Sequence, residues 1–328
     1  MKIEVNTHEK NILKFAEEHK EVVVLSADLG TSCEVKQFRA TYPERYLTMG
    51  IAEQNMCSWA AGLAREGYRP FLHTFAVFLY RRILDQLEMS VAYPNLPVVF
   101  VGFVPGITTP GGVTHQSIND IAVLRSVPNM AIFDIGDATE IEGVLDLAYK
   151  FNGPVYIRML RKEVPRLFPA NEPMQFNRAR VLSEGDDIVI LSSSICTEEA
   201  MRATSVLKEK GLSVQHMHVS TLKPFTDPTI VEAIRKSKHG VVTLENHMDV
   251  GGLGSAVAEV IAENNLGKKL VKIGLKSYPH GASKMYLMKH YGIDAMSLIS
   301  GVEELIGKKL NVAEKDLEEV RFVDFLEV

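Results

Sequence analysis

The side chains best suited to proton transfer lie just beyond predicted strands. Glu53 begins a predicted helix in the segment RYLTMGIAEQNM, and His115 follows a Gly111-Gly112 turn in GGVTHQS. A carboxylate at a helix start also stabilises the helix by about 0.3 to 1 kcal/mol, and a histidine after two glycines is also common in surface loops. Imidazole and carboxylate groups are nevertheless frequent general acids and bases. Both residues are therefore candidate catalytic groups.

Short apolar strands alternate with helical segments along the chain, and this alternation predicts an α/β fold in which helices cover parallel sheets. In the first half the strands are nearly continuous apolar runs, which indicates burial on both faces. They are expected at 22–27, 69–75, 96–104, 130–135 and 154–160. A helix from about Gln116 would place His115 at the carboxyl end of a strand, where open α/β sheets bind ligands.

Two helices of the first half carry apolar side chains at helical spacing. One stripe consists of Met56, Trp59, Ala60 and Leu63, and the other of Ile83, Leu84, Leu87 and Val91. We expect both stripes to face the core.

The segment between Lys162 and Asn177 contains three prolines and mixed charges, which predicts that no regular element forms there. We expect two domains, 1–168 and 186–328, with a linker at 169–185. The second domain is predicted to have strands at 187–193, 213–219, 240–245 and 270–275 and helices at about 197–210, 228–237 and 253–264. After Val312 an acidic tail, with apolar residues between its charges, is expected to form a last strand or an interface; these residues are Leu317, Val320, Phe322, Val323 and Phe325.

The composition is that of an ordinary soluble protein. With 46% hydrophobic residues, 23% charged residues and a net charge of -5, the chain lacks the basic surface that nucleic acid requires. It has no signal-like start and no apolar run of about 18 to 20 residues, so we expect a cytoplasmic protein without membrane contact. Cys33, Cys57 and Cys196 lack metal-ligand spacing and are expected to be reduced thiols.

Three motifs occur in the order typical of transketolases: GIAEQNM, then TFAVF about 20 residues later, then GGVTHQS. The chain resembles the pyrimidine-binding and C-terminal domains of that family over nearly all of its length. The resemblance implies a doubly wound parallel sheet followed by a smaller α/β domain, with thiamine diphosphate as cofactor and transfer of a two-carbon ketol unit as activity. Two alternatives share the fold, namely the β subunit of a 2-oxoacid dehydrogenase and a non-catalytic assembly subunit.

The resemblance also implies roles for individual residues. Glu53 matches the glutamate that hydrogen-bonds N1′ of the cofactor's aminopyrimidine, and Phe75 and Phe78 match aromatic residues that pack on that ring. Asp28, in SADLG, matches an aspartate near the thiazolium ring. His115 matches a histidine that assists proton transfer and contacts the sugar. Glu53 and His115 are thus expected to be catalytic, with Glu53, Phe75, Phe78 and Asp28 binding the cofactor.

The expected sugar-binding residues are only partly those of the family. Ser32, Arg161 and His115 match residues that bind the substrate, the first two at its phosphate end. Val5, Phe103 and Gly111 stand where the family has an arginine, a histidine and an aspartate that contact sugar. The resemblance therefore implies a sugar phosphate or another anionic sugar, and these departures predict a substrate outside the usual pentose phosphates, such as a branched, deoxygenated or sulfonated sugar.

The metal-binding half of a thiamine diphosphate site is missing from the sequence. The family binds Mg²⁺ and the diphosphate through a GDG motif and a later Asn, but IGDA at 135–138 and EGDD at 184–187 lack the second glycine. GGLGSAV at 251–257 resembles a phosphate-binding loop, although such turns are common. We expect no metal ligand in this chain, and a separate N-terminal transketolase subunit that binds Mg²⁺ and the diphosphate. Two chains of each kind would form an α2β2 assembly.

Overall fold

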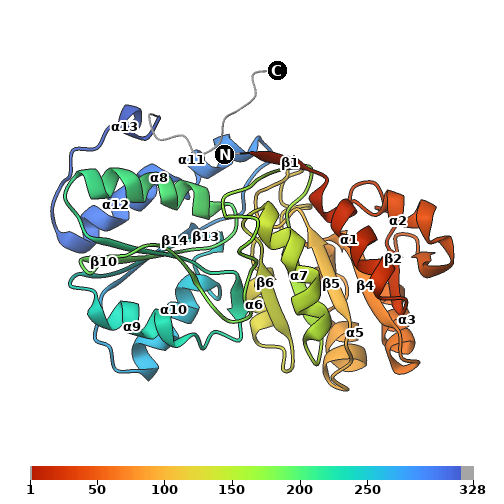
Figure 1. Cartoon of the computed structure of the whole chain (residues 1–328). Coiled ribbons are helices and arrows are strands. Elements are labelled where there is room, and N and C mark those ends of the chain that lie inside the picture. Colours follow the sequence, from red (N-terminus) through yellow and green to blue (C-terminus); the bar gives the residue numbers. More distant parts are fainter. Residues whose placement is uncertain (1, 319–328) are drawn as a thin grey trace.

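The computed structural model describes residues 2–318, which form two α/β regions side by side (Figure 1). The first region contains a seven-stranded sheet in the order β12-β6-β7-β5-β4-β2-β3. Its parallel strands are β2 (Val22–Ser26), β3 (Tyr46–Thr48), β4 (Arg69–Phe75), β5 (Val99–Phe103), β6 (Ala131–Asp134) and β7 (Val155–Met159). The strand β12 (Thr221–Lys223) comes from the second half of the chain and joins the edge in the antiparallel direction.

Helices cover both faces of this sheet. On one face α1 (Thr7–Glu18) packs against α7 (Ala138–Lys150), and on the other α3 (Glu53–Arg65) packs against the turns that follow β4 (Figure 1). The remaining elements are short: α2 (Lys36–Thr41), η1 (Pro43–Arg45), α4 (Phe78–Arg81), α5 (Leu84–Gln86), η2 (Leu87–Ala92) and α6 (Asp120–Arg125). Since successive parallel strands are joined through helices, the loops that follow the strands meet at one edge of the sheet.

The second region contains a five-stranded sheet in the order β14-β13-β10-β11-β9. Its strands are β9 (Arg180–Ser183), β10 (Ile188–Ser192), β11 (Val214–His218), β13 (Gly240–Met248) and β14 (Leu270–Leu275), and only β9 is antiparallel to its neighbour. Two helices, α8 (Cys196–Glu209) and α12 (Ala295–Ile306), cover one face, and α9 (Pro228–Lys236) and α10 (Leu253–Glu263) cover the other (Figure 1). Two shorter helices are α11 (Lys284–His290) and α13 (Glu314–Glu318).

The predicted α/β class and the longer elements are confirmed. The strands β4 and β14 have the predicted bounds, and the three long helices predicted for the second half correspond to α8, α9 and α10 within about one residue. Every residue of β2, β5, β6, β7 and β10 is buried. The continuous apolar runs thus correctly indicated strands covered on both faces.

Some local predictions are wrong. The segment 162–177 does contain a regular element, β8 (Glu163–Pro165), which pairs with β1 (Ile3–Val5). Trp59 is 53% exposed, because the buried stripe of α3 runs instead through Met56, Ala60 and Ala64. Part of the tail forms α13 rather than a strand, with Leu317 buried. Val320, Phe322, Val323 and Phe325 lie outside the described residues.

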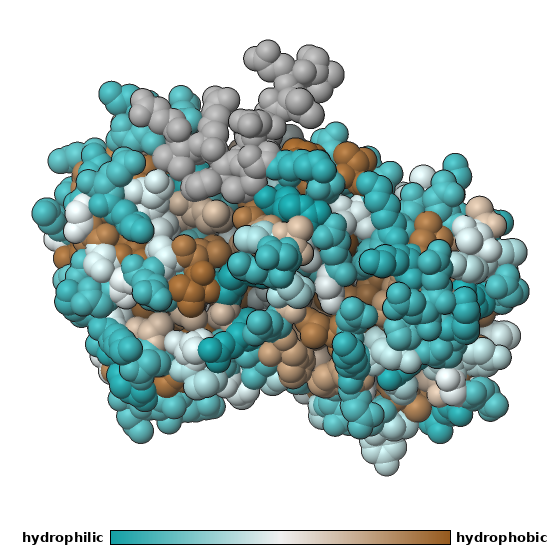
Figure 2. Space-filling view, in the orientation of Figure 1, coloured by the Kyte–Doolittle hydropathy of each residue, from teal (hydrophilic) through white to brown (hydrophobic). Residues whose placement is uncertain are grey.

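The hydrophobic core continues from one region to the other. Residues of β2, β4 and α3 belong to the same buried cluster as Leu191, Met217 and Leu222 of the second half. The strand β9 lies within the range 169–185 that was expected to be a linker. The face shown in Figure 2 is mostly hydrophilic, with smaller hydrophobic groups. Among residues 2–318, no helix combines the length and apolar character that crossing a bilayer would need.

Candidate functional site

Glu53 is positioned by the connection from β3 to α3. The chain leaves β3 at Thr48, turns at Gly50 with a φ of 71°, and begins α3 at Glu53. Glu53 is only 4% exposed, and its Oε1 atom lies 2.5 Å from Nη1 of Arg82. The buried carboxylate is thus paired with a cation that follows α4. The sequence analysis did not identify Arg82, which lies 29 residues after Glu53 in the chain.

Phe75, Phe78 and His115, which come from two separate motifs, meet in the structure. Phe75 ends β4 and Phe78 begins α4, and their ring centroids lie 5.9 Å apart with an interplanar angle of 25°. The His115 ring contacts both phenylalanine rings edge-on, with its centroid 6.0 Å from that of Phe75 and 5.8 Å from that of Phe78. An imidazole therefore lies beside a pair of stacked aromatic rings at the carboxyl edge of the sheet.

The loop that carries His115 is held by hydrogen bonds to backbone carbonyl groups, and the predicted helix does not form there. No helix begins at Gln116, and α6 begins only at Asp120. Instead, Gly106 N donates to Ser117 O at 2.8 Å, and the Gln116 amide donates to Thr109 O and His280 O at 3.2 and 3.3 Å. Because the Gln116 side chain donates hydrogen bonds to these two carbonyls, the segment is anchored as a loop.

Gly111 gives His115 the space it occupies. A Cβ at Gly111 would lie 3.0 Å from Cβ of His115, a closer approach than ordinary van der Waals contact allows. His115 N donates to Gly112 O at 2.9 Å, and Thr114 Oγ1 lies 2.9 Å from His115 Nδ1. The departure from the family's aspartate at Gly111 therefore has a local steric role.

Residues of the second region pack against the loop that carries His115. Gly281 lies against Gly112 through backbone contacts, and the fully buried Arg158 connects several segments. Its guanidinium forms ion pairs of 2.9 Å with Asp120 and Asp134 and donates to Ser117 O at 3.2 Å and Asn246 O at 2.9 Å. Burial raises the pKa of Asp134, whereas the Arg158 charge lowers it. This network fixes the base of the His115 loop, and the sequence analysis did not detect it.

Asp28 and Ser32 lie in the loop that follows β2 and help to line a cavity of about 190 Å³. Asp28 adopts a left-handed conformation with a φ of 60°. Hydroxyl groups and two cations face this cavity, and its lining residues are Asp28, Leu29, Gly30, Thr31, Ser32, Lys36, Arg39, Tyr46 and Thr48. Lys36 and Arg39 are exposed residues one helical turn apart on α2. The cavity therefore suits an anionic group, and the sequence analysis missed both cations.

Arg161 connects this cavity with the aromatic pair. Its Nη1 atom donates to Ser32 O at 3.0 Å, and its Cζ atom lies 5.3 Å from the Phe75 ring centroid. The predicted residues Ser32 and Arg161 are therefore brought together. Through Phe75 they form a continuous series of contacts with Phe78 and His115.

Two of the three departing residues are not free to contact a ligand in the way that the family residues would. Phe103 is fully buried, with its ring 5.3 Å from that of His8 and 6.2 Å from that of His73. The two histidines share a hydrogen bond of 3.0 Å between their Nε2 atoms, and burial lowers the pKa of His73 to about 4. Phe103 thus belongs to the core, and Gly111 lies at the surface but lacks a side chain. Val5, which is 49% exposed, presents only an apolar side chain there.

The glycine-rich loop GGLGSAV already binds a carboxylate of this chain. Glu245, which is fully buried, accepts hydrogen bonds from Leu253 N at 2.7 Å and Gly254 N at 2.8 Å at the start of α10. A Cβ at Gly252 would lie 1.9 Å from Glu245 Oε2. Burial raises the pKa of Glu245 to about 7. The backbone N–H groups of this loop therefore serve as hydrogen-bond donors to Glu245, a side chain of the same chain.

The IGDA segment is also used structurally. Asp137 accepts from Glu140 N at 2.8 Å and from the backbone N–H groups of Leu167 and Phe168 at 3.0 and 2.9 Å. It therefore caps α7 and ties the chain after β8 to it. The three cysteines, Cys33, Cys57 and Cys196, are buried and form no disulfide.

Comparison with known families gives two matches that together cover most of the chain. Residues 5–166 match the transketolase pyrimidine-binding domain, and residues 177–298 match the transketolase C-terminal domain. A putative transketolase C-terminal section from Methanocaldococcus jannaschii is 36% identical, with 92% of this chain and 95% of that protein aligned. A 6-deoxy-6-sulfo-D-fructose transketolase subunit from a Clostridium species is 35% identical over 93% of this chain and 94% of that protein.

A solved structure agrees with these matches. It is described as a split gene transketolase, an inactive beta4 tetramer, and it superposes with a TM-score of 0.85. The solved structure is 35% identical in sequence to this chain, and the alignment covers 93% of this chain and 98% of the solved one.

Proposed function

This chain belongs to the transketolase family, and from that premise we propose that Glu53, Phe75, Phe78, Asp28 and His115 form its half of a thiamine diphosphate site. The main support for this proposal is that a buried carboxylate, two stacked phenylalanines and a histidine lie together at one edge of the sheet, with Arg82 in contact with both Glu53 and Phe78. Two relatives that it matches over nearly their whole length are a separate C-terminal section and a transketolase subunit. The chain is accordingly the β subunit of a heteromeric transketolase, a transferase of ketol units that acts with a partner subunit.

The residues fit the aminopyrimidine ring of thiamine diphosphate, the cofactor on which the family depends. A flat, positively charged group, the guanidinium of Arg82, already bonds to Glu53 and lies on Phe78, which supports a site for a planar ring with an N–H donor. When bound, the cofactor supplies a carbon nucleophile that carries the ketol unit. Glu53 would hold a proton at N1′, and the aromatic rings would orient the pyrimidine. Asp28 would lie toward the thiazolium side.

His115 is proposed as the residue that moves protons at the sugar hydroxyl groups. Its ring lies beside the stacked phenylalanines, and an imidazole has one ring nitrogen that can donate a hydrogen bond and one that can accept. The Gly111-Gly112 turn and the anchored Gln116 hold the ring in place. A fixed imidazole at this edge can both donate a hydrogen bond to a sugar and exchange a proton with it.

We assign Mg²⁺ and the diphosphate to the N-terminal subunit. Two sequence segments that resemble phosphate or metal motifs have internal uses, since Asp137 caps α7 and the GGLGSAV amides bind Glu245. The proposed assembly contains two chains of each kind. The cofactor would lie at the boundary between the two kinds of chain.

The substrate is proposed to be a sugar with one anionic end. Arg161 and Ser32 lie between the aromatic pair and the cavity faced by Lys36 and Arg39, and a guanidinium binds phosphate or sulfonate oxygens through paired N–H donors. A relative that acts on a sulfonated sugar supports a substrate beyond the pentose phosphates. Turnover of xylulose 5-phosphate and of 6-deoxy-6-sulfofructose should be compared in the reconstituted enzyme. A strong preference for xylulose 5-phosphate would refute the departure from pentose phosphates.

Reconstitution tests the two-chain site. The chain is mixed with its N-terminal partner, Mg²⁺ and thiamine diphosphate, and ketol transfer is measured for the mixture and for each chain alone. We expect activity only in the mixture. Full activity of this chain alone would overturn the proposal.

A further inference from the structure

Arg82 covers the carboxylate to which the proposed function assigns the cofactor. It follows α4 directly, and its Nη1 atom lies 2.5 Å from Oε1 of Glu53. The Arg82 side chain is 42% exposed, whereas that of Glu53 is 5% exposed. The guanidinium therefore lies between a buried acid and the surface of the subunit.

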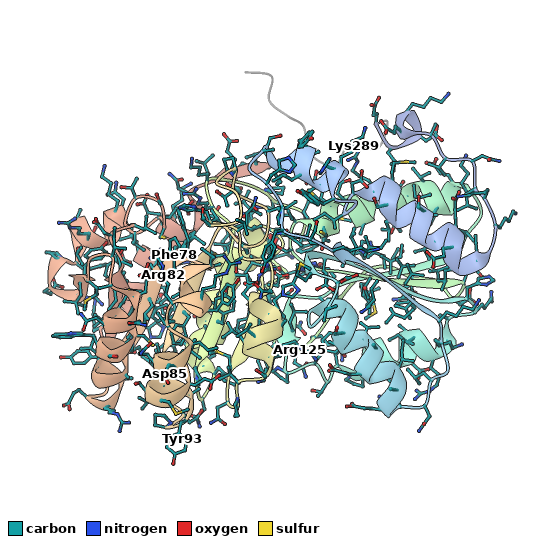
Figure 3. The ribbon with its side chains drawn as sticks, turned by 180° about the vertical axis from the view of Figure 1, so that it is seen from behind. Phe78, Arg82, Asp85, Tyr93, Arg125 and Lys289 are labelled. Carbon is teal, nitrogen blue, oxygen red and sulfur yellow. The ribbon has the colours of Figure 1, made fainter. Side chains whose placement is uncertain are left out.

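The same guanidinium covers an aromatic ring. Its Cζ atom lies 3.7 Å from the Phe78 ring centroid, well inside the roughly 6 Å within which a cation is attracted to a ring face. Figure 3 shows Phe78 and Arg82 next to each other, above Asp85 of the same segment. Arg82 thus uses both the acid and the ring that an aminopyrimidine would need.

The two groups have similar chemistry in this position. A guanidinium is flat, carries a delocalised positive charge and presents N–H donors in its plane. An aminopyrimidine protonated at N1′ is likewise flat and cationic, with an N–H donor directed at the carboxylate and a π face available for stacking. One carboxylate oxygen and one ring face cannot serve both groups at the same time.

From this overlap, which rests on the proposed function, we infer that Arg82 stands in for the aminopyrimidine in the subunit and must move aside when the cofactor binds. Breaking the ion pair and the ring contact opposes cofactor binding. Arg82 is therefore a determinant of cofactor affinity, and its removal strengthens the binding of thiamine diphosphate.

The neighbouring arginine is held by different groups. Arg81 Nε donates to Tyr80 Oη at 2.8 Å, and Arg81 Nη1 donates to Val113 O at 3.0 Å. These contacts anchor the loop before His115 and do not involve Glu53 or Phe78. Arg82 instead forms an ion pair with Glu53 and a cation–π contact with Phe78, the two residues assigned to the cofactor. Its half-exposed side chain can turn into solvent by rotation about its own side-chain torsions.

The test measures binding rather than turnover. Arg82→Met and Arg82→Lys are each reconstituted with the N-terminal partner, and thiamine diphosphate is titrated in excess Mg²⁺ by calorimetry. The matched control is Arg65→Met, which removes one charge from an exposed residue at the other end of α3, about 18 Å from Glu53. Since partly exposed ion pairs are weak, we expect Arg82→Met to lower the cofactor Kd about fivefold, Arg82→Lys to lower it less, and Arg65→Met to leave it unchanged.

An unchanged or higher Kd in Arg82→Met would overturn the inference, because Arg82 would then be neutral or would help to hold the cofactor. A second variant separates this failure from that of the proposed function. If Glu53→Gln abolishes ketol transfer while Arg82→Met fails to tighten binding, only the role of Arg82 is wrong. If Glu53→Gln leaves transfer intact, the proposed function itself is wrong.

Discussion

The two α/β regions each contain a buried glutamate near a helix start, and they use it differently. Glu245 of the second region accepts hydrogen bonds from two backbone N–H groups of α10, and its surroundings are fully buried. Glu53 of the first region is bonded to one half-exposed arginine. A carboxylate held by the backbone is part of the scaffold, whereas one held by a partly exposed side chain can change partners. The edge of the sheet that carries Glu53 is therefore suited to binding a ligand, whereas the surroundings of Glu245 are suited to stabilising the fold.

The surroundings of the two acids extend this contrast. At the edge that carries Glu53 the chain places two stacked aromatic rings and a histidine. Arg161 links these rings to a cavity faced by Lys36 and Arg39. Beside Glu245 it places Gly252, where the acid leaves no room for a Cβ. The same fold can thus present one open and one closed carboxyl edge, and the side chains decide which edge carries chemistry.

The largest expected effect distinguishes the two acids directly. Glu53→Gln should lower kcat of the reconstituted enzyme by about 10² to 10⁴ because it removes the acid assigned to N1′. Glu245→Gln should leave kcat within about twofold, since Glu245 contacts backbone of α10. Steady-state ketol transfer at saturating cofactor measures both. A loss of turnover in Glu245→Gln with the fold intact would break the comparison.

A somewhat smaller effect is expected at the histidine. His115→Asn keeps a polar side chain but removes the imidazole assigned to proton transfer, so kcat should fall by about 10². Steady-state ketol transfer at saturating cofactor and substrate measures this effect. A kcat equal to that of the parent chain would show that His115 is a loop residue without a role in proton transfer.

The next effect concerns the anionic end of the substrate. Arg161→Met removes the guanidinium beside Ser32, and loss of a charged hydrogen bond of about 1.5 kcal/mol or more corresponds to at least about a tenfold rise in KM. We expect kcat to change little. Arg65→Met serves again as the control for charge. An equal KM for the two variants would exclude Arg161 from substrate binding.

The last effect concerns stability and its pH dependence rather than turnover or substrate binding. Burial raises the pKa of Glu245 to about 7 from an ordinary value of 4.5, so between these pH values the folded chain keeps a proton that the unfolded chain has lost. This group therefore makes stability fall as pH rises from about 4.5 to 7, by up to about 1.4 kcal/mol per pH unit. Glu245→Gln should remove that slope in urea unfolding followed at several pH values. A slope identical to that of the parent chain would contradict the assigned protonation.

The sequence predicted those parts of the fold that local patterns determine. Long apolar runs such as β4 and β14 and the amphipathic helices α8 to α10 were predicted within about a residue, because each buries its own repeating face. Three-residue strands such as β8 and β12 were missed, since they form only when a distant strand offers hydrogen-bond partners. Trp59 was misplaced because helical spacing does not say which of two adjacent stripes faces the sheet.

The candidate site shows the same division. The motifs led to Glu53, Phe75, Phe78 and His115, and the structure brings the last three into contact and links Phe78 to Glu53 through Arg82. Arg82 itself was missed because an ion pair across 29 residues has no local signature. The support of the His115 loop by Arg158 and Gly281 depends on packing between the two regions and could not be predicted from spacing. The roles of the site residues are still predictions.

Exchange of the cofactor's C2 proton with deuterium tests the central claim most directly, because the claim is that Glu53 activates thiamine diphosphate from this chain's half of the site. The exchange rate is measured in the reconstituted assembly with the parent chain and with Glu53→Gln, both saturated with cofactor. We predict fast exchange with the parent chain and a rate close to that of free thiamine diphosphate with Glu53→Gln. Equal, fast exchange in both assemblies would contradict the account.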